Sequence, residues 1–302
     1  MEAVLSLQNV RKAYENHLAV DDVSFDVPKG CIFGLLGPNG AGKTSLIRIV
    51  TTITKADSGN VYLNGEKLNK SHPSMIGYMP EERGLYKKMK VGDHLIYLAR
   101  LKGMSPEDAK EAIYGWMQKF EIESWWEKKI EELSKGMQQK IQFIATVCHR
   151  PPLLILDEPF SGLDPINTNL IKEEIEKLKN NGTSIIFSTH RMEQVEEVCE
   201  RIVLINAGKK VLEGSVSDVK NNYKEHKYQI EFEGGIPTAV LEEYTVISQK
   251  DHSFIVKLKE ERDSNFLLKK LIDSGTHIKS FKEILPTLNE IFIKNVGFNP
   301  NN

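Results

Sequence analysis

The chain has 302 residues, enough for about two domains of ordinary size. Hydrophobic residues make up 40% and charged residues 27% of the sequence, a balance typical of a globular protein, which excludes an intrinsically disordered one. The 40 Lys and Arg residues nearly match the 42 Asp and Glu residues. The net charge of −2 therefore argues against binding nucleic acid through a broad basic surface, and we expect no nucleic-acid partner.

No apolar run approaches the roughly 20 residues that cross a bilayer, and the longest runs are Leu153–Leu156 and Ile202–Ile205. The first residues include Glu2 and no basic stretch before an apolar run, so we expect no signal peptide and a cytoplasmic chain. A role at a membrane would then require docking onto another protein.

The cysteines are too few and too scattered for a disulfide framework or a zinc site. They are Cys31, Cys148 and Cys199, which form no C-x-x-C pair and are odd in number. We expect three reduced thiols, mostly buried.

The N-terminal part alternates apolar runs with turn signals. Leu5–Val10 and Ala19–Val27 predict two strands, and Pro28–Gly30 predicts the turn that ends the second. The continuous apolar run Cys31–Leu36 predicts a buried strand. After a glycine-rich loop, Lys43–Thr52 predicts a helix.

A helical insert is predicted from about residue 85 to residue 150. Val91–Leu101 and Glu107–Phe120 have helical spacing, and Ser105 before Pro106 is typical of a helix start. All three tryptophans of the chain lie in this insert: Trp116, Trp125 and Trp126. We expect them in the insert's core or on a docking surface, not in a ligand cage.

Strands and helices alternate from residue 153 to about residue 214. The predicted strands are Leu153–Leu156, Ser184–Ser188 and Arg201–Ile205. The predicted helices are Asn169–Asn180 and Arg191–Glu200. This alternation is typical of a parallel sheet covered by helices on both faces.

A second, smaller domain is predicted after a polar linker at Val219–Glu225. The expected order is strand, helix, strand, strand, helix, strand and a final helix, which is a split β-α-β, ferredoxin-like arrangement. The elements are Lys227–Glu233, Thr238–Tyr244, Thr245–Ser248, Phe254–Leu258, Asn265–Ser274, His277–Phe281 and Thr287–Val296, with a turn around Lys250–His252. We therefore predict domains at residues 1–220 and 226–298.

The sharpest motif is a phosphate-binding loop (P-loop), which fits G-x-x-x-x-G-K-[ST] between the buried strand and the helix. Its backbone N–H groups and the helix N-terminus can surround a phosphate chain. Lys43 is predicted to contact the β- and γ-phosphates, and the Thr44 hydroxyl to bind Mg²⁺. The predicted nucleotide-binding residues here are Gly37, Pro38, Asn39, Gly40, Ala41, Gly42, Lys43, Thr44 and Ser45.

A second motif ends the predicted strand at Leu153–Leu156 with two acids, Asp157 and Glu158, which is typical of a Walker B segment. Asp157 is predicted to hold Mg²⁺. Glu158 is predicted to polarise the attacking water as a general base.

Three further segments complete a family pattern in order along the chain. They are Leu133–Gln138 before a helix, Ser161–Asp164 after Glu158, and Ser188–His190 after the next strand. Together with the P-loop and Walker B motifs, they make residues 2–220 resemble the ATP-binding cassette (ABC) ATPases, in which these segments are the signature, the D-loop and the switch. The fold that this resemblance implies is a P-loop α/β cassette with a mixed sheet core, an antiparallel β part and a helical subdomain.

The resemblance also implies a homodimer around two Mg-ATP. Ser134 and Gly136 would contact the ATP of the other copy, and Asp164 would lie at the dimer interface. His190 would contact the γ-phosphate and help orient the water, and Tyr14 would stack on adenine. A preference for ATP over GTP is supported by this resemblance and by Tyr14 alone.

Two positions depart from the family pattern. Glu81 stands after Pro80 where the family has glutamine; a carboxylate can still ligate Mg²⁺, but it adds negative charge beside the phosphates. Lys135 and Met137 replace glycine and glutamine of the signature. Since Lys43, Asp157, Glu158 and His190 all remain, we interpret these departures as subfamily variation.

With these two departures and its C-terminal domain, the chain resembles the ATP-binding subunits of ABC-2-type exporters. The segments Pro80–Tyr86 and Leu133–Met137 are similar to the sodium-efflux branch of these exporters. This resemblance implies a peripheral protein at the cytoplasmic face that drives a separate permease, with contacts near Glu81–Tyr86 and the tryptophans. Two alternatives stay open: a soluble ABC ATPase acting on ribosomes or DNA, and a nucleotide-gated regulator whose tail binds a small ligand.

Overall fold

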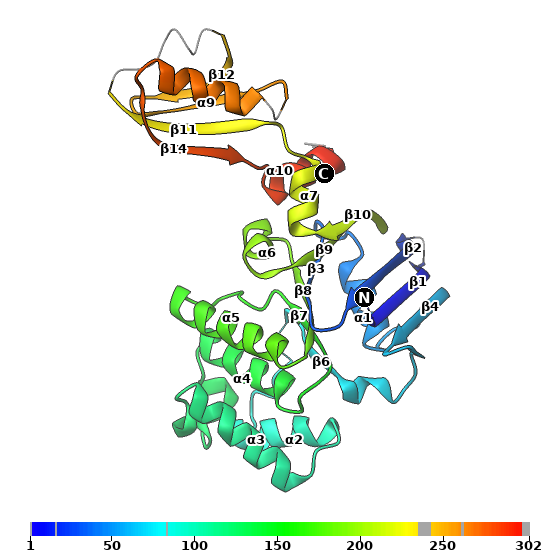
Figure 1. The fold of residues 1–302 in the computed structure, drawn as a ribbon. Helices are drawn as coiled ribbons and strands as arrows, with labels where there is room; N and C mark the ends of the chain where they lie inside the picture. The colour runs from blue at the N-terminus through cyan, green and yellow to red at the C-terminus, as the bar shows by residue number, and fades with distance from the viewer. Residues whose placement is uncertain (1, 16, 83, 235–242, 261–262, 298–302) are drawn as a thin grey trace. The chain divides into compact units, whose positions relative to one another are not determined.

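The computed structural model of the chain describes residues 2–15, 17–82, 84–234, 243–260 and 263–297. It divides into two compact units, Met1–Val216 and Ser217–Asn302, each of which has its own core (Figure 1). Among the described residues, no helix combines the length and the apolar character needed to cross a membrane.

An antiparallel sheet of four strands opens the first unit, with the order β2-β1-β4-β5. Its strands are β1 (Ala3–Tyr14), β2 (His17–Pro28), β4 (Ser58–Leu63) and β5 (Glu66–Lys67). The two predicted N-terminal strands are confirmed and are longer than expected. The short strands β4 and β5 were not predicted.

The central sheet has six strands in the order β10-β9-β3-β8-β7-β6. They are β3 (Ile32–Leu36), β6 (Ile76–Met79), β7 (Leu153–Asp157), β8 (Ser184–Thr189), β9 (Arg201–Asn206) and β10 (Lys209–Ser215). All neighbouring pairs are parallel except β9 and β10. Every residue of β3, β7 and β8 is buried, as continuous apolar runs between two layers require.

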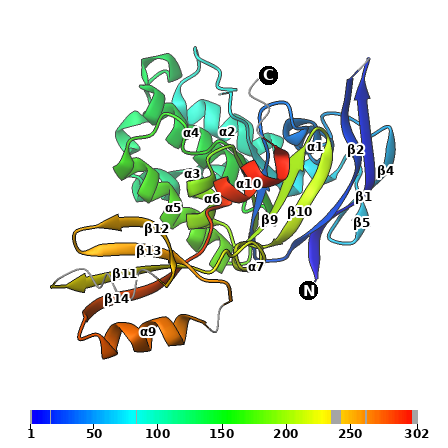
Figure 2. The same ribbon diagram turned by 90° about the horizontal axis from the view of Figure 1, so that it is seen from above.

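Helices flank the central sheet at α1 (Lys43–Val50), α5 (Pro165–Asn180) and α6 (Met192–Val198). Helix α5 begins four residues before the predicted start because Asp164 caps it and Pro165 occupies its first position. Figures 1 and 2 show the antiparallel sheet on one side of the central sheet and α5 on the other.

The main core joins the two sheets of the first unit. It includes Leu5 of β1, Phe25 of β2, Phe33 of β3, Ile47 of α1 and Ile155 of β7. The Phe25 and Phe33 rings stack with centroids 5.6 Å apart, which fixes the antiparallel sheet against the strand that leads into the P-loop.

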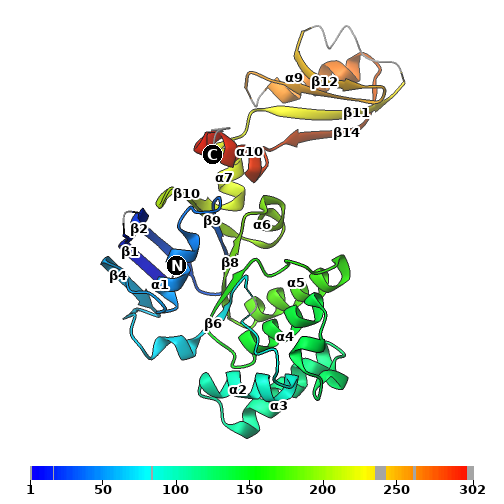
Figure 3. The ribbon, with the colours of Figure 1, turned by 180° about the vertical axis from the view of Figure 1, so that it is seen from behind.

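The helical subdomain contains α2 (Val91–Leu101), α3 (Pro106–Lys119) and α4 (Lys135–Val147), which lie together at one end of the unit in views from opposite sides (Figures 1 and 3). Three short 3₁₀ turns are described: η1 (His72–Met75), η2 (Glu123–Trp125) and η3 (Ile130–Glu132). The predicted cap of α3 is confirmed, since Ser105 Oγ accepts the backbone N–H of Asp108 at 3.1 Å.

The three tryptophans are half-buried in this subdomain, between the two expected positions of core and docking surface. The Trp116 ring lies against Phe120 and Phe143, with centroids 5.7 and 5.9 Å away. Trp126 covers Gly92, where an added Cβ would lie 2.3 Å from the indole. All three cysteines of the chain are free and buried.

The second unit is an antiparallel sheet with the order β12-β13-β11-β14. Its strands are β11 (Lys227–Glu233), β12 (Thr245–Lys250), β13 (Ser253–Lys257) and β14 (His277–Ile284). Among the described residues after β11, two helices are formed, α9 (Asp263–Asp273) and α10 (Leu288–Val296). This is the ferredoxin-like strand order. Figure 2 shows α9 along the sheet, and its Leu267 and Leu271 join Phe232 and Phe254 in the core.

The predicted linker at Val219–Glu225 is wrong in its first half. Residues Val216–Asn222 form a helix, α7, because Val219 is buried and gives the segment one apolar contact face. The predicted helix Thr238–Tyr244 lies, except for its last two residues, outside the described residues.

Candidate functional site

The P-loop connects β3 to α1, and glycine is required at two of its positions. Gly37 has φ 149° and Gly42 has φ 107°. An added Cβ would lie 2.2 Å from the Ile205 carbonyl oxygen at Gly37, and 2.2 Å from the Ala19 carbonyl oxygen at Gly42. The loop is thus wedged between β9 and β2, with no room for a side chain at Gly37 or Gly42.

Lys43 is the first residue of α1, and its side chain turns back over the loop. The ammonium donates to the carbonyl oxygens of Gly37 at 2.7 Å and Pro38 at 3.0 Å. Burial lowers the pKa of Lys43, while the Asp157, Glu158 and Glu81 carboxylates act in the opposite direction. The ammonium is therefore partly desolvated, the condition in which an interaction with phosphate is strongest.

The Walker B acids lie at the carboxyl end of β7, and both are buried. Burial raises the pKa of Asp157, and the Glu158 and Glu81 carboxylates add to the rise. Three carboxylates thus crowd around one lysine, and a divalent cation would relieve this excess of negative charge. The Thr44 hydroxyl and the carboxylates of Asp157 and Glu81 are hard oxygen ligands on one cavity, so these residues fit Mg²⁺.

Glu158 is held by the segment that follows β8. Its Oε2 accepts the Thr189 hydroxyl at 3.0 Å, and its Oε1 accepts the His190 backbone N–H at 2.9 Å. The His190 ring Nδ1 lies 2.6 Å from the same Oε1. The backbone of Glu158 is left-handed, with φ 49°. A left-handed backbone is uncommon for a residue other than glycine, and here it is combined with hydrogen bonds to both carboxylate oxygens.

These groups surround one cavity of 360 Å³. It brings together the P-loop, Glu81, Asp157, Glu158, His190 and Tyr14, as the motifs predict. Its lining residues are Tyr14, His17, Ala19, Asn39, Gly40, Ala41, Gly42, Lys43, Thr44, Ser45, Glu81, Asp157, Glu158 and His190. Gly37 and Pro38 do not line it but hold Lys43 through their carbonyl groups.

Two lining residues were missed by the sequence analysis. His17 and Ala19 belong to β2 and belong to no motif. Their position in the hairpin could have indicated them, because His17 pairs with Tyr14 between β1 and β2. Tyr14 is 36% exposed, and its ring can therefore receive a planar ligand group.

Ser134, Gly136 and Asp164 do not line this cavity. Ser134 caps α4 by accepting the Met137 N–H at 3.3 Å, and Asp164 caps α5 by accepting the Asn167 N–H at 3.0 Å. This backbone contact, together with the Asn167 side chain, lowers the pKa of Asp164. The arrangement agrees with the expectation that these three residues serve the site of another copy, which stays a prediction.

Comparison with known proteins adds two family matches. The model of the family described as "ABC transporter" matches residues 20–161, and that of the "ATP-binding protein DrrA1-3-like, C-terminal domain" matches residues 214–296. A relative from Bacillus subtilis, the ABC transporter ATP-binding protein YhaQ, whose name calls it uncharacterized, is 42% identical over 97% of this chain and 99% of its own.

Relatives with more specific names share the first unit. The linearmycin resistance ATP-binding protein LnrL of Bacillus subtilis is 34% identical over 72% of this chain and 70% of its own. The Nod factor export ATP-binding protein I of Cupriavidus metallidurans is 36% identical over 71% of this chain and 72% of its own.

Solved structures share the fold. The ATP-binding subunit of an ABC transporter superposes with a TM-score of 0.69 and 28% identity over 73% of this chain and 93% of its own. A dimeric bacterial ABC transporter cassette has a TM-score of 0.65 at 23% identity, over 70% of this chain and 98% of its own.

Proposed function

The chain belongs to the ATP-binding proteins of ABC transporters, and from this premise we propose that two copies of it bind two Mg-ATP and drive a separate membrane permease for export. Members of this family hydrolyse ATP, so the chain is an ATPase. The observation that carries the proposal is the single cavity in which Lys43, Asp157, Glu158 and His190 meet.

The chemistry of the proposed site is hydrolysis of the γ-phosphate. The P-loop N–H groups and Lys43 bind the phosphate chain and neutralise charge that develops on it. Glu158 accepts a proton from the attacking water, and its contacts to Thr189 and His190 fix both carboxylate oxygens for that role. Mg²⁺, held by Thr44, Asp157 and Glu81, would supply Lewis-acid polarisation of the phosphates.

The proposed dimer closes each site with the α4 N-terminus of the other copy. Ser134 and Gly136 lie at that N-terminus, where the helix dipole favours an anion. Ile166 follows the Asp164 cap and is 82% exposed, which is unusual for isoleucine and is consistent with an interface there.

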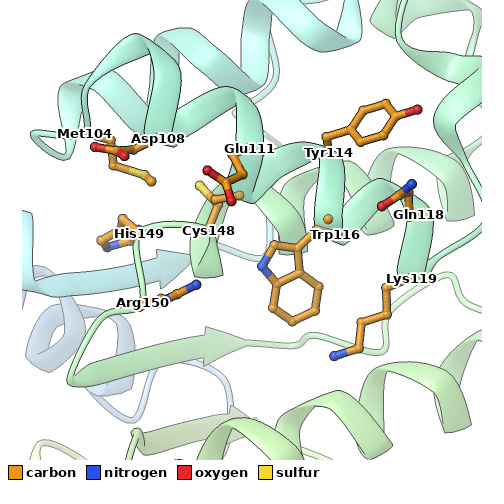
Figure 4. Close-up of a pocket in the computed structure, with 12 residues that line it drawn as sticks. Met104, Asp108, Glu111, Tyr114, Trp116, Gln118, Lys119, Cys148, His149 and Arg150 are labelled. Atoms are coloured by element: carbon orange, nitrogen blue, oxygen red, sulfur yellow. The ribbon is translucent and has the colours of Figure 1, made fainter.

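For the permease, we propose a docking groove on the helical subdomain. A cavity of 810 Å³ lies between α3 and the segment Cys148–Arg150 that follows α4 (Figure 4). Trp116 of α3 and Arg150 of the following segment both line it, and Tyr114, which also lines it, is 47% exposed. An aromatic and a cationic group on one concave surface suit a helical segment of a protein partner.

This groove covers part of the surface predicted from the tryptophans. Of the other predicted contact segment, Glu81 lines the nucleotide cavity, while Tyr86 packs edge-on against Tyr97 of α2 and both rings are about half exposed. The export direction is supported by relatives whose names refer to resistance and export. The sodium-efflux assignment stays a prediction, and the cargo is set by the permease.

Co-purification from native membranes tests the transport role. The tagged chain is solubilised gently with its membranes, and the proteins that accompany it are identified. We expect a stoichiometric membrane protein, and fewer copies of it with Trp116→Ala or Arg150→Glu. Recovery with ribosomes, with DNA or alone, from a preparation that still hydrolyses ATP, would contradict the transport role.

A further inference from the structure

Helix α4 touches three functional parts of the first unit. It begins at Ser134, it ends beside the Cys148–Arg150 wall of the groove, and its middle faces the nucleotide cavity's two acidic loops. Two glutamines in that middle part, Gln139 and Gln142, are only 3% and 5% exposed. Glutamine is rarely so buried in a helix whose neighbours Ile141 and Phe143 are fully apolar and buried.

Each glutamine reaches the backbone beside a predicted catalytic acid. Gln142 Nε2 donates to the Pro80 carbonyl at 2.7 Å, and Pro80 directly precedes Glu81. Gln139 Nε2 donates to the Pro159 carbonyl at 2.9 Å, and Pro159 directly follows Glu158. Since proline has no N–H, its carbonyl is the only backbone group through which either loop position can be tied.

Stability alone does not account for Gln142. Its Oε1 is buried without a hydrogen-bond partner among the described residues, and an unpaired buried acceptor is costly. An apolar side chain of similar size would remove this unpaired acceptor, but it would also leave the Pro80 carbonyl without its donor. The side chain is therefore explained by its donor end, which holds the loop that carries Glu81.

We propose that Gln142 and Gln139 are positioning residues that tie the Glu81 loop and the Glu158 loop to α4. Because Ser134 and Gly136 lie at the N-terminus of the same rigid helix, binding of the other copy's ATP there sets the metal-site carboxylate and the general base of this copy. This inference rests on the proposed function, and it assigns the route by which the two sites of the dimer affect one another.

The test compares Gln142→Leu with Thr146→Val in the full-length chain. Thr146 is one turn further along α4 and equally buried, and its hydroxyl donates to the Gln142 carbonyl of its own helix, so it controls for a lost buried hydrogen bond. We expect Gln142→Leu to raise the Mg²⁺ concentration for half-maximal ATPase by about tenfold. ATP binding in EDTA stays unchanged, and Thr146→Val leaves the Mg²⁺ dependence as it is.

A double-mutant cycle with Glu81→Gln identifies the route. If Gln142 acts through the Glu81 loop, Gln142→Leu has little further effect on the Mg²⁺ dependence once Glu81 is replaced. Equal effects in both backgrounds, or the same shift with Thr146→Val, would overturn the proposal. Should Gln142→Leu fail to purify folded, Gln142→Met provides the same loss of the donor with a flexible apolar chain.

Gln139→Leu gives an independent readout on the other loop. We expect kcat to fall about tenfold with an unchanged Mg²⁺ dependence, since Pro159 adjoins Glu158 and not Glu81. In addition, either variant should lower the Hill coefficient for ATP toward 1. Absence of ATPase in the unmodified chain, or full activity of Glu158→Gln, would contradict the proposed function itself and is distinguishable from these results.

Discussion

The Nδ1 atom of His190 lies 2.6 Å from Oε1 of Glu158, the same oxygen that accepts the backbone N–H of His190. A carboxylate acceptor on this side requires the proton on Nδ1. A contact from Nε2 to a phosphate oxygen then requires a second proton on the ring, because Nε2 of the neutral Nδ1–H tautomer is an acceptor. His190 therefore contacts the proposed general base through Nδ1 and, as the imidazolium, could donate to the γ-phosphate through Nε2.

Glu158→Gln should reduce ATP turnover by about 10²–10⁴-fold, because the amide cannot accept the proton of the water. An amide oxygen can still accept the Thr189 hydroxyl, so we expect the fold and nucleotide affinity to be retained. Single-turnover hydrolysis and equilibrium ATP binding check the two parts. Turnover at the unmodified rate would remove Glu158 from the role of base.

Asp157→Asn should stabilise the ligand-free protein while it abolishes Mg²⁺-dependent hydrolysis. Burial raises the pKa of Asp157, so the ionised form is disfavoured in the folded state relative to the unfolded one. The sign follows from linkage: the stabilising contribution of this carboxyl is present below its unfolded pKa and is lost as pH rises through its folded pKa. At neutral pH the charged aspartate is therefore a cost that asparagine avoids.

Thermal unfolding with and without Mg²⁺ measures this prediction. We expect a higher Tm for Asp157→Asn at pH 7, a smaller difference near pH 4, and no gain from Mg²⁺ in the variant. ATPase activity should fall at least about 100-fold, since metal polarisation supplies several kcal/mol. A lower Tm at pH 7 would show that the carboxylate is stabilising as an ion.

Motifs predicted which residues of the P-loop and Walker B segments would lie together because each motif is local in the sequence. The P-loop, with Lys43 and Thr44, is one short segment between a buried strand and a helix, and Asp157 and Glu158 adjoin at the end of another strand. Parallel neighbours β3, β8 and β7 then place both segments at one sheet edge. The part of the cavity lined by Lys43, Thr44, Asp157 and Glu158 therefore follows from the order of these strands.

Other features depend on contacts that no local pattern encodes. Strand β10 is mostly exposed and shows little alternation of buried and exposed residues. It is therefore recognised as a strand by its pairing with β9 and not by its sequence. The contact of His17 with the cavity and the bond from Gln142 to Pro80 each join segments through the fold. Helix α7 was missed because Val219 is its one buried residue. The polar residues around Val219 give the segment the composition of a linker.

Gly42→Ala should lose much more stability and ATP affinity than Gly40→Ala. Both glycines have positive φ, 107° and 77°, so both substitutions add the backbone strain of about 1–2 kcal/mol for a left-handed residue. Only at Gly42 would the new Cβ also meet a backbone oxygen, that of Ala19 at 2.2 Å, whereas at Gly40 nothing lies within 4 Å. The alanine side chain could be accommodated at Gly42 only if β2 or the loop moved.

Urea unfolding and nucleotide titration compare the two variants. Gly40→Ala should lose about 1–2 kcal/mol and keep measurable ATP binding. For Gly42→Ala we expect a larger loss of unfolding free energy and no saturable binding. Equal losses of unfolding free energy in the two variants would mean that backbone strain alone destabilises both. The close approach of the Gly42 Cβ to β2 would then contribute nothing.

Tyr14→Ala should weaken ATP binding by roughly 5- to 150-fold, because base–aromatic stacking contributes about 1–3 kcal/mol. The ring lines the cavity and is 36% exposed, with the Lys12 ammonium 5.4 Å from its centroid. Tyr14→Phe keeps the ring face and serves as the matched control, so its affinity should stay near that of the unmodified chain. Because stacking tolerates any base, GTP binding should weaken by the same factor, as isothermal titration with each nucleotide would show. If Tyr14→Ala left the affinity unchanged, another lining residue would have to contact the adenine. His17, which pairs with Tyr14 across the hairpin, would then be substituted next.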